Sequence, residues 1–355
     1  MDFTLTAEQS LLQDSVRRSL AQAGERRGPR SRRAIVDLGL PALPLSEDIG
    51  GLGGRPLEVA LVAGEMGRAL SADPRFQAAV QVAPLLAALG TGDELPAAIA
   101  GGEALVVLAG LEAAGRGDIT FVEATARKTA DGFALSGAKS VVLGAAEATV
   151  LLVTAKSADE AFPGIGVFRV EREAAAQFLR ACQTIDGFEA ADLVMQDLAV
   201  PASALVGIDC ADLLRDASDA AVTALCGEAL GAMEAAFYVT LDYLKTRHQF
   251  GVAIGSFQAL QHRMADRFVD LEQARSMLYR LVGAQSESVA ERRRAVSAAK
   301  FFIGRLGKTL GADMIQLHGG IGMTEEHVVG HYYRRLLAID GRFGDEDYHL
   351  ALLAA

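Results

Sequence analysis

The sequence predicts an α+β fold with an N-terminal helical domain over residues 1–104, a middle β-barrel domain over residues 105–207 and a C-terminal four-helix bundle over residues 208–355. Three observations lead to this prediction. Apolar residues recur at helical spacing towards both ends of the chain. Between these regions lie short runs rich in β-branched residues, which Gly and Asp turns separate. A length of 355 residues with 51% hydrophobic residues is enough for several domain-sized units with substantial cores.

The first predicted element is a helix that begins with a capping box. The Thr6 side chain can accept the backbone N–H of Gln9, while the Gln9 side chain reaches back to Thr6. Apolar residues then follow at helical spacing: Leu11, Leu12, Val16 and Leu20. A second helical pattern covers residues 56–70, where Pro56 suits the first turn.

Two segments between these helices could be mistaken for phosphate sites. The basic segment at residues 26–33 is broken by Gly28 and Pro29. It is either a solvated loop or frayed helix end, or a patch that contacts phosphate. The Gly-rich segment at residues 50–54 follows no predicted strand and fits no phosphate-loop spacing, so we interpret it as a turn.

The middle of the chain, residues 105–207, is predicted to form strands. Residues 104–109 form a short apolar run, and Asp131-Gly132 is a hairpin signal. Further strand-like runs occupy residues 119–126, 133–135, 141–143, 149–154 and 166–170. Pro201 and Gly207 mark the end of this region.

The C-terminal region predicts three long Ala-rich helices, at residues 217–245, 257–284 and 289–315. Amphipathic helices of this length bury their apolar faces by packing as a bundle.

Composition excludes several function classes. A formal charge of −11 argues against nucleic-acid binding, which needs a basic surface. No apolar run reaches about 18 residues without a charge or Gly, so we expect no membrane span. Three cysteines without a CxxC pair, and an N-terminus without a signal-peptide pattern, predict a cytoplasmic protein. His327 and His331 lie four apart, but without a third ligand we expect a solvated helix face and no metal.

Two segments of the C-terminal region carry longer motifs. One is Arg247-His-Gln-Phe-Gly251, followed by Phe257-Gln258; the other is Gln316-Leu-His-Gly-Gly-Ile-Gly-Met323. Weaker matches lie at residues 136–139 and 200–207. In this order and spacing, over nearly the whole chain, these motifs resemble the acyl-CoA dehydrogenase family.

The resemblance implies FAD as the cofactor, in an oligomer whose subunits share cofactor sites. An Arg at a helix end can fork onto a diphosphate, and a Phe can cover an aromatic ring system. The structural alternatives are an Arg on the helix dipole with a core Phe, and a Gly C-cap. The implied cofactor-binding residues are Arg247, Gln249, Phe250, Phe257, Gln258, Gln316, Gly319 and Gly320.

The family removes the α-proton of an acyl-CoA thioester with a carboxylate base while the β-hydrogen passes as hydride to flavin N5. At the two positions where the family carries that base, this sequence has Phe343 and Ala221. Our candidate base is Glu228, two helical turns beyond Ala221 on the same helix face. The alternative is a Glu that is exposed or paired with an Arg across the bundle. Asp340 and Asp345 are further candidates.

A second departure lies in the middle domain. Residues 140–143 read Ser-Val-Val-Leu, where the family has a Trp and a Thr beside the flavin ring, although the backbone there can still supply N–H donors. With these departures, the chain resembles the subunits of heteromeric pimeloyl-CoA-type or steroid-CoA dehydrogenases.

We therefore expect an FAD-dependent acyl-CoA dehydrogenase of fatty-acid or steroid side-chain β-oxidation. The implied partners are an acyl-CoA substrate, electron-transferring flavoprotein as acceptor, and further copies of the chain or a homologous subunit. One alternative is a non-catalytic or half-site subunit that completes the FAD site of a partner. Another is a flavoprotein of the same fold with different chemistry, such as an oxidase.

Overall fold

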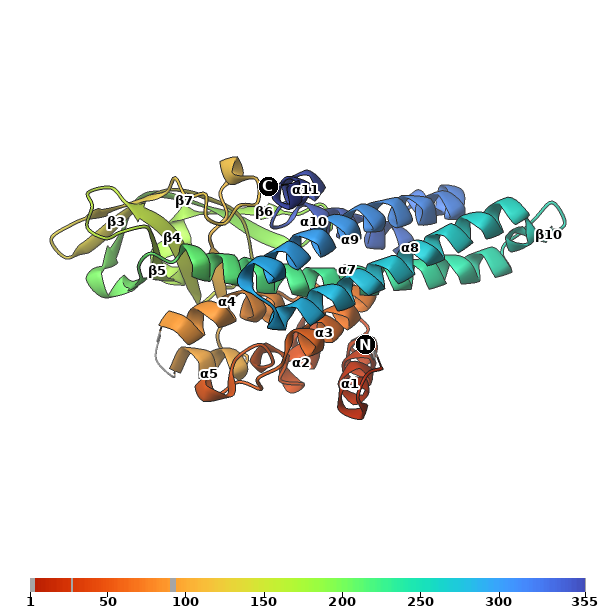
Figure 1. The fold of residues 1–355 in the computed structure, drawn as a ribbon, viewed down its shortest axis with the longest axis horizontal. Helices are drawn as coiled ribbons and strands as arrows, with labels where there is room; N and C mark the ends of the chain where they lie inside the picture. The colour runs from red at the N-terminus through yellow and green to blue at the C-terminus, as the bar shows by residue number, and fades with distance from the viewer. Residues whose placement is uncertain (1–3, 27, 90–93, 355) are drawn as a thin grey trace. The chain divides into compact units, whose positions relative to one another are not determined.

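The computed structural model describes residues 4–26, 28–89 and 94–354. The chain divides into two compact units. Unit 1 comprises Met1–Arg26, Pro56–Ala72 and Val222–Ala355, and unit 2 comprises Arg27–Arg55 and Asp73–Ala221. The helical ends and the central sheet of the predicted α+β fold are confirmed (Figure 1). The domain boundaries at residues 104 and 207 stay predictions.

Unit 2 is built around a mixed eight-stranded sheet with the order β6-β7-β3-β2-β4-β5-β8, in which β1 pairs with β4. The strand β4 pairs in parallel with β1 and β2, whereas the other pairs are antiparallel. The strands are β1 (Val106–Ala109), β2 (Thr125–Lys128), β3 (Gly132–Leu143), β4 (Val150–Ser157), β5 (Ile165–Glu171), β6 (Leu179–Gln183), β7 (Glu189–Pro201) and β8 (Leu205–Gly207).

The predicted strand runs match this sheet in part. Asp131 and Gly132 do close a hairpin between β2 and β3, where the Thr129 N–H donates to the Gly132 carbonyl at 2.9 Å. Two predicted runs, 133–135 and 141–143, belong to the single strand β3. The strands β6 and β7 were not predicted, because they contain few β-branched residues and many Ala, polar or charged ones.

Helices accompany the sheet in unit 2: α2 (Pro29–Asp37), α4 (Arg75–Leu89), α5 (Glu94–Ala100) and α6 (Arg172–Ala175). The strand β4 is buried over Val150–Ala155, which places it in the centre of the core. Three rings pack edge to face beside it, with centroids 5.3 to 6.0 Å apart: Phe133, Phe162 and Phe168.

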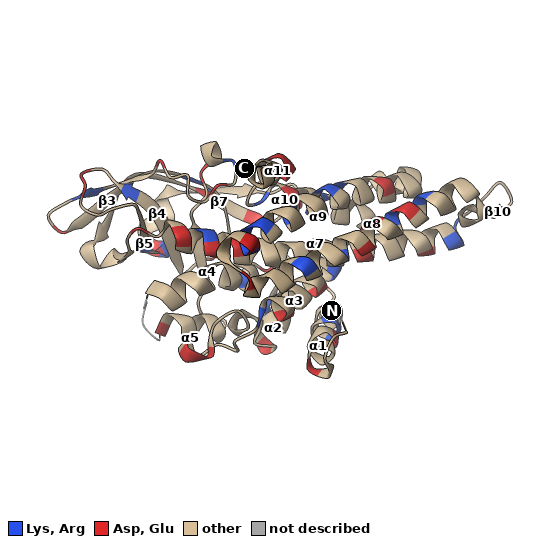
Figure 2. Ribbon diagram, viewed as in Figure 1, with Lys and Arg blue, Asp and Glu red and all other residues tan. Residues whose placement is uncertain are grey.

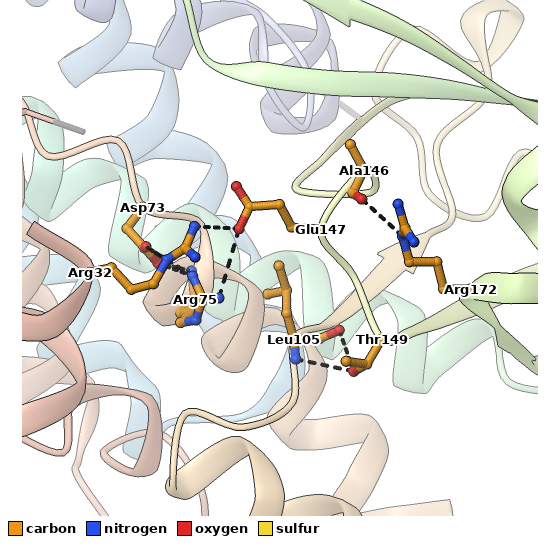
Figure 3. Close-up of polar contacts among 8 residues, drawn as sticks. All are labelled: Arg32, Asp73, Arg75, Leu105, Ala146, Glu147, Thr149 and Arg172. Atoms are coloured by element: carbon orange, nitrogen blue, oxygen red, sulfur yellow. Dashed lines mark hydrogen bonds and ion pairs between the residues drawn. The ribbon is translucent and has the colours of Figure 1, made fainter. Parts of the chain in front are cut away.

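The basic segment at residues 26–33 is mostly helix, which corrects the prediction of a loop or frayed end. Pro29 begins α2, and Arg32 on this helix joins an ion-pair cluster (Figure 3). Asp73 lies 2.9 Å from Arg75 and 3.4 Å from Arg32. Glu147, in the turn before β4, pairs with both arginines. These ion pairs connect α2 and the first turn of α4 to the turn before β4.

Unit 1 is helical. It contains α1 (Ala7–Ala23), α3 (Pro56–Ala69), the part of α7 (Ala211–Thr246) from residue 222, α8 (Gln258–Gly283), α9 (Val289–His318), α10 (Val328–Gly341) and α11 (Glu346–Ala354). Acidic and basic residues are interspersed along α7, α8 and α9 (Figure 2). The predicted capping box at the start of α1 is present. The predicted Gly-rich turn lies between α3 and the short 3₁₀ helix Glu47–Ile49.

The helices α3 and α7 cross at very short distance, which only glycine permits. A Cβ at Gly231 would lie 1.8 Å from the carbonyl oxygen of Gly64, and one at Gly67 would lie 2.0 Å from the carbonyl oxygen of Glu228. No side chain fits at these positions. The crossing therefore fixes the place of Glu228 on α7.

The helix α7 is long and apolar enough to cross a membrane by length and composition alone. However, 89% of its most apolar window is buried inside the protein, as in the core helix of a globular fold.

Candidate functional site

A small hairpin follows the C-terminal end of α7. Strands β9 (His248–Gln249) and β10 (Val252–Ala253) pair around a turn in which Phe250 has φ +53° and Gly251 has φ +80°. Positive φ at both central residues is the geometry of a tight hairpin turn, and it is unfavourable for Phe. Phe250 lies at the tip with 91% of its surface exposed. A strained, exposed aromatic residue indicates a contact with another molecule.

The other predicted residues of this segment surround the hairpin. Arg247 directly follows α7, and its side chain is exposed. Phe257 precedes the first residue of α8, Gln258, and packs edge to face against Phe250 at 6.2 Å. The hairpin thus presents a guanidinium, two aromatic rings, and the amides of Gln249 and Gln258 to solvent.

The second group of predicted residues lies where α9 ends. Gly319 has φ +63°, and its N–H donates to the carbonyl of Gln316. A Cβ at Gly319 or at Gly320 would meet no atom within 4 Å, so the backbone here is open on that side. The exposed side chain of Gln316 lies one turn earlier. We call residues 319–323, which directly follow α9, the glycine turn.

Two residues outside both groups join them. Tyr243, one helical turn before Arg247, stacks on His318 at a ring-centroid distance of 4.5 Å. The Tyr243 hydroxyl also donates to the carbonyl of His318 at 3.3 Å. His318 directly precedes Gly319, so the structure brings the hairpin and the glycine turn to the same end of unit 1.

These eight residues fit the chemistry of a flavin dinucleotide. A guanidinium suits a diphosphate, an exposed ring can cover a flat ring system, and an open glycine backbone allows close approach. Amide side chains add donors and acceptors. All eight residues belong to unit 1, and all are exposed to solvent in the single chain.

Residues 140–143 of unit 2, where the resemblance implies contacts with the flavin ring, fit a flavin less well. Val141 has φ +51°, and its N–H donates to Oδ1 of Asp192 on β7 at 2.8 Å. This backbone donor, which we expected to serve a ligand, is thus engaged within the chain. Leu143 has no hydroxyl to donate.

The candidate base Glu228 is buried and ion-paired. Its side chain Oε1 accepts a hydrogen bond of 2.6 Å from Nε of Arg335 on α10. Glu228 is 1% exposed and Arg335 is 2% exposed. Of the two interpretations of Glu228, the structure shows the arrangement of a Glu paired with an Arg across the bundle, and its role as base stays a prediction.

The two further carboxylates also have structural partners. Oδ2 of Asp340 lies 2.9 Å from Nζ of Lys308. Partial burial acts to lower the pKa of Lys308, but its hydrogen bonds to Asp340 and Glu346 raise that pKa overall. Asp345 accepts the backbone N–H of Tyr348 in the first turn of α11. Ala221, in unit 2, is buried.

Phe343 lies in a segment that two buried side chains hold. It is 3% exposed and has φ +56°. Nζ of Lys300 donates to the carbonyls of Asp340 and Gly344 at 2.6 and 2.8 Å, and Nε2 of His349 donates to the carbonyl of Phe343 at 3.0 Å. Burial lowers the pKa of Lys300 to about 8. Burial and the charge of Lys300 lower the pKa of His349 to about 4. The one signal of this clamp in the sequence is a Lys within a stretch of small and apolar residues of α9.

A second buried cation, Lys139, lies in unit 2 and was not among the predicted site residues. Nζ of Lys139 donates to Oε1 of Glu112 at 2.6 Å and to the hydroxyl of Thr154 at 2.8 Å. Burial lowers the pKa of Lys139 to about 8. Glu112 in turn accepts the backbone N–H groups of Glu123 and Ala124. The pair therefore anchors the segment between β1 and β2 to β3.

The two histidines at i and i+4 have local partners. Nδ1 of His327 caps α10 by accepting the N–H of Val329, and Nε2 of His331 donates to the carbonyl of Glu325. Among the described residues no group of three or more potential ligands could hold a metal ion.

Sequence comparisons find a family model and several relatives that are similar to this chain. Residues 220–355 match the family model described as "Acyl-CoA dehydrogenase, C-terminal domain". The chain is 39% identical over 118 residues to the acyl-CoA dehydrogenase IpdE2 of Mycobacterium tuberculosis, a match that spans about a third of that relative (35%) and 33% of this chain. It is 26% identical to the probable acyl-CoA dehydrogenase YngJ of Bacillus subtilis, over 93% of this chain and 92% of YngJ.

Solved structures share the fold. A variant of the steroid ACAD Tcur3481-Tcur3483 superimposes with a TM-score of 0.83 at 29% identity, over 99% of this chain and 98% of that one. The ChsE4-ChsE5 complex of M. tuberculosis gives 0.87 at 24% identity, over 100% and 98%. A glutaryl-CoA dehydrogenase of Mycobacterium smegmatis in complex with FADH2 gives 0.86 at 19% identity, over 99% and 94%.

Proposed function

We propose that the chain, which is similar to acyl-CoA dehydrogenases over nearly its whole length, takes part in the FAD-dependent α,β-dehydrogenation of an acyl-CoA thioester. One observation carries the proposal: the exposed hairpin with Arg247 and Phe250 and the open glycine turn lie at the same end of unit 1. A match to a relative that was solved with FADH2 supports the choice of cofactor.

When bound, FAD supplies the hydride acceptor for the reaction. The residues of this chain bind and orient it. The guanidinium of Arg247 binds the diphosphate, the ring of Phe250 covers a flat face of the dinucleotide, and the glycine turn places its backbone against it. Because these residues face outward in the single chain, we propose that they contact FAD in a neighbouring subunit.

The residues at the possible positions of the catalytic base favour a second, narrower function. Phe343 and Ala221 cannot take a proton, and the carboxylate of Glu228 is held by the buried guanidinium of Arg335. These observations favour a half-site subunit, which completes the FAD site of a homologous partner that carries the base. The likeness of this chain to the steroid ACAD Tcur3481-Tcur3483, at 29% identity, supports this form of the proposal.

The first experiment tests the cofactor. The chain is purified alone and together with a homologous partner from its own genome, and each preparation is reconstituted with FAD. We expect flavin to be retained and to be bleached by an acyl-CoA when oxygen is excluded. Flavin that is never retained would contradict the proposal. Flavin that turns over oxygen without bleaching would instead indicate an oxidase.

The second experiment separates the two functions. In the assembly that retains flavin, Glu228→Gln is compared with Glu325→Gln, a control at an exposed Glu that also pairs with an Arg. Loss of turnover in Glu228→Gln with full flavin content, at a temperature where circular dichroism shows the variant to be folded, would identify Glu228 as the base. Unchanged turnover would leave Glu228 a structural role and support the half-site function.

We further propose electron-transferring flavoprotein as the acceptor, and a bulky or dicarboxylic acyl group on the substrate. Reduced assembly is mixed with electron-transferring flavoprotein or with an artificial dye. Reoxidation by the dye alone would contradict this choice of acceptor.

A further inference from the structure

Three aromatic rings from three elements lie in contact at the end of unit 1 that carries the predicted cofactor residues. Tyr243 comes from α7, His318 from the last turn of α9, and His327 from the residue that caps α10. Tyr243 and His318 are stacked with an interplanar angle of 25°. The rings of His318 and His327 lie 4.3 Å apart between centroids, and Tyr243 meets His327 edge-on at 6.3 Å. We call these residues the ring stack.

Hydrogen bonds fix the orientation of each ring. Nδ1 of His318 donates to the carbonyl of Met314 at 2.8 Å, and the hydroxyl of Tyr243 donates to the carbonyl of His318 at 3.3 Å. Nδ1 of His327 accepts the N–H of Val329 at 3.3 Å. His318 is therefore held through both its ring and its carbonyl. Burial, followed by the neighbouring His327, lowers the pKa of His318, which keeps the ring neutral at neutral pH.

The ring stack lies between the two predicted cofactor segments. Tyr243 is one turn before Arg247 on α7, and His318 is followed directly by Gly319. The two glycines have no side chain that could restrain them, and a Cβ at either would meet no atom within 4 Å. Glycine loses more conformational freedom on ordering than any other residue. The restraint on Gly319 and Gly320 therefore comes from their neighbours in the chain, and His318, which directly precedes them, is the neighbour that Tyr243 holds.

We propose, on the basis of the proposed function, that Tyr243 and His318 are positioning residues that hold the hairpin and the glycine turn in one fixed arrangement for the dinucleotide. They do not touch the cofactor in this role. They lower the entropic cost of binding, because the turn is ordered before the ligand arrives.

The test compares variants in the assembly that retains flavin. Tyr243→Leu removes the ring and the hydroxyl, and Tyr243→Phe removes the hydroxyl alone. His318→Leu removes the second ring. Tyr238→Leu is the control, because Tyr238 lies on the same helix and is half exposed, outside the ring stack.

Two measurements are made on each variant: the dissociation constant of FAD, and amide hydrogen exchange of residues 319–323 in the absence of FAD. We expect Tyr243→Leu and His318→Leu to weaken FAD binding about tenfold by loss of preorganisation. Exchange of the glycine turn should be faster in both variants. Tyr243→Phe should show a smaller effect on both readouts, and Tyr238→Leu none.

The outcomes separate this proposal from the proposed function. Unchanged exchange in residues 319–323 of Tyr243→Leu would overturn the positioning role. Faster exchange with an unchanged FAD dissociation constant would also overturn it, since the order of the turn would then not matter to the cofactor. A parent assembly that binds no FAD would overturn the proposed function, and with it the role of the ring stack in cofactor binding. The exchange data would still show whether Tyr243 orders the glycine turn.

Discussion

The carboxylate of Glu228 and the guanidinium of Arg335 form a buried ion pair between α7 and α10, with 2.6 Å between Oε1 and Nε. The two residues are 107 positions apart in the chain. Both side chains are almost fully excluded from water. A buried pair of this kind is costly to break, because removing one partner leaves the other charge in a medium of low dielectric constant.

The first prediction concerns the stability of this pair. Glu228→Gln should lower the free energy of unfolding by about 3–5 kcal/mol, because Arg335 loses its carboxylate. The control Glu325→Gln, at an exposed pair with Arg334, should cost less than about 1 kcal/mol. Chemical unfolding followed by far-ultraviolet circular dichroism measures both. Equal effects of the two variants would show that burial of the pair contributes nothing.

The second prediction concerns the crossing of α3 and α7. Gly231→Ala should destabilise the protein by about 3 kcal/mol or more, because the new methyl would overlap the carbonyl of Gly64. Gly283→Ala, at the end of α8, adds the same methyl where no atom lies within 4 Å. It should raise stability by up to about 1 kcal/mol. A thermal unfolding midpoint for Gly231→Ala that equals the parent's would contradict the close crossing.

The third prediction concerns unit 2. Lys139→Met should destabilise it by about 3 kcal/mol, since it leaves the buried carboxylate of Glu112 without its cation. Arg127→Met, at the exposed pair with Asp197, should change stability by less than about 1 kcal/mol. Proteolysis of the segment between β1 and β2 provides the second readout. Protection of that segment in Lys139→Met would argue against its anchoring by Glu112.

The fourth prediction concerns acid stability. The pKa of His349 is about 4 in the folded protein, below its ordinary value of 6.5. The unfolded chain therefore binds the proton first, and stability falls as the pH drops from about 6.5 towards about 4. The full difference corresponds to about 3 kcal/mol.

A pair of variants isolates this effect. His349→Gln keeps a donor for the carbonyl of Phe343 but does not titrate, so its unfolding free energy should vary less over this pH range. The exposed His262→Gln serves as control and should retain the pH dependence of the parent. Identical pH profiles for the parent and His349→Gln would show that another group causes the acid loss.

The sequence by itself determined the features that depend on neighbours in the chain. The Thr6–Gln9 capping box and the Asp131-Gly132 hairpin formed as predicted, because their hydrogen bonds join residues a few positions apart. The long helices followed from apolar periodicity. Family motifs predicted the cofactor residues, and the structure places them in two groups at the same end of unit 1.

Only the tertiary structure decided the side-chain pairs. Glu228 meets Arg335, Lys300 reaches the carbonyl of Asp340, and Tyr243 stacks on His318 across separations of 107, 40 and 75 residues. Such pairs leave no periodic signal, because they depend on how the helices are rotated and spaced when they pack. The close crossing at Gly231 and the strained turn at Phe343 have the same origin. The local sequence determines the helices and strands, whereas long-range packing determines which partner each buried charged side chain meets.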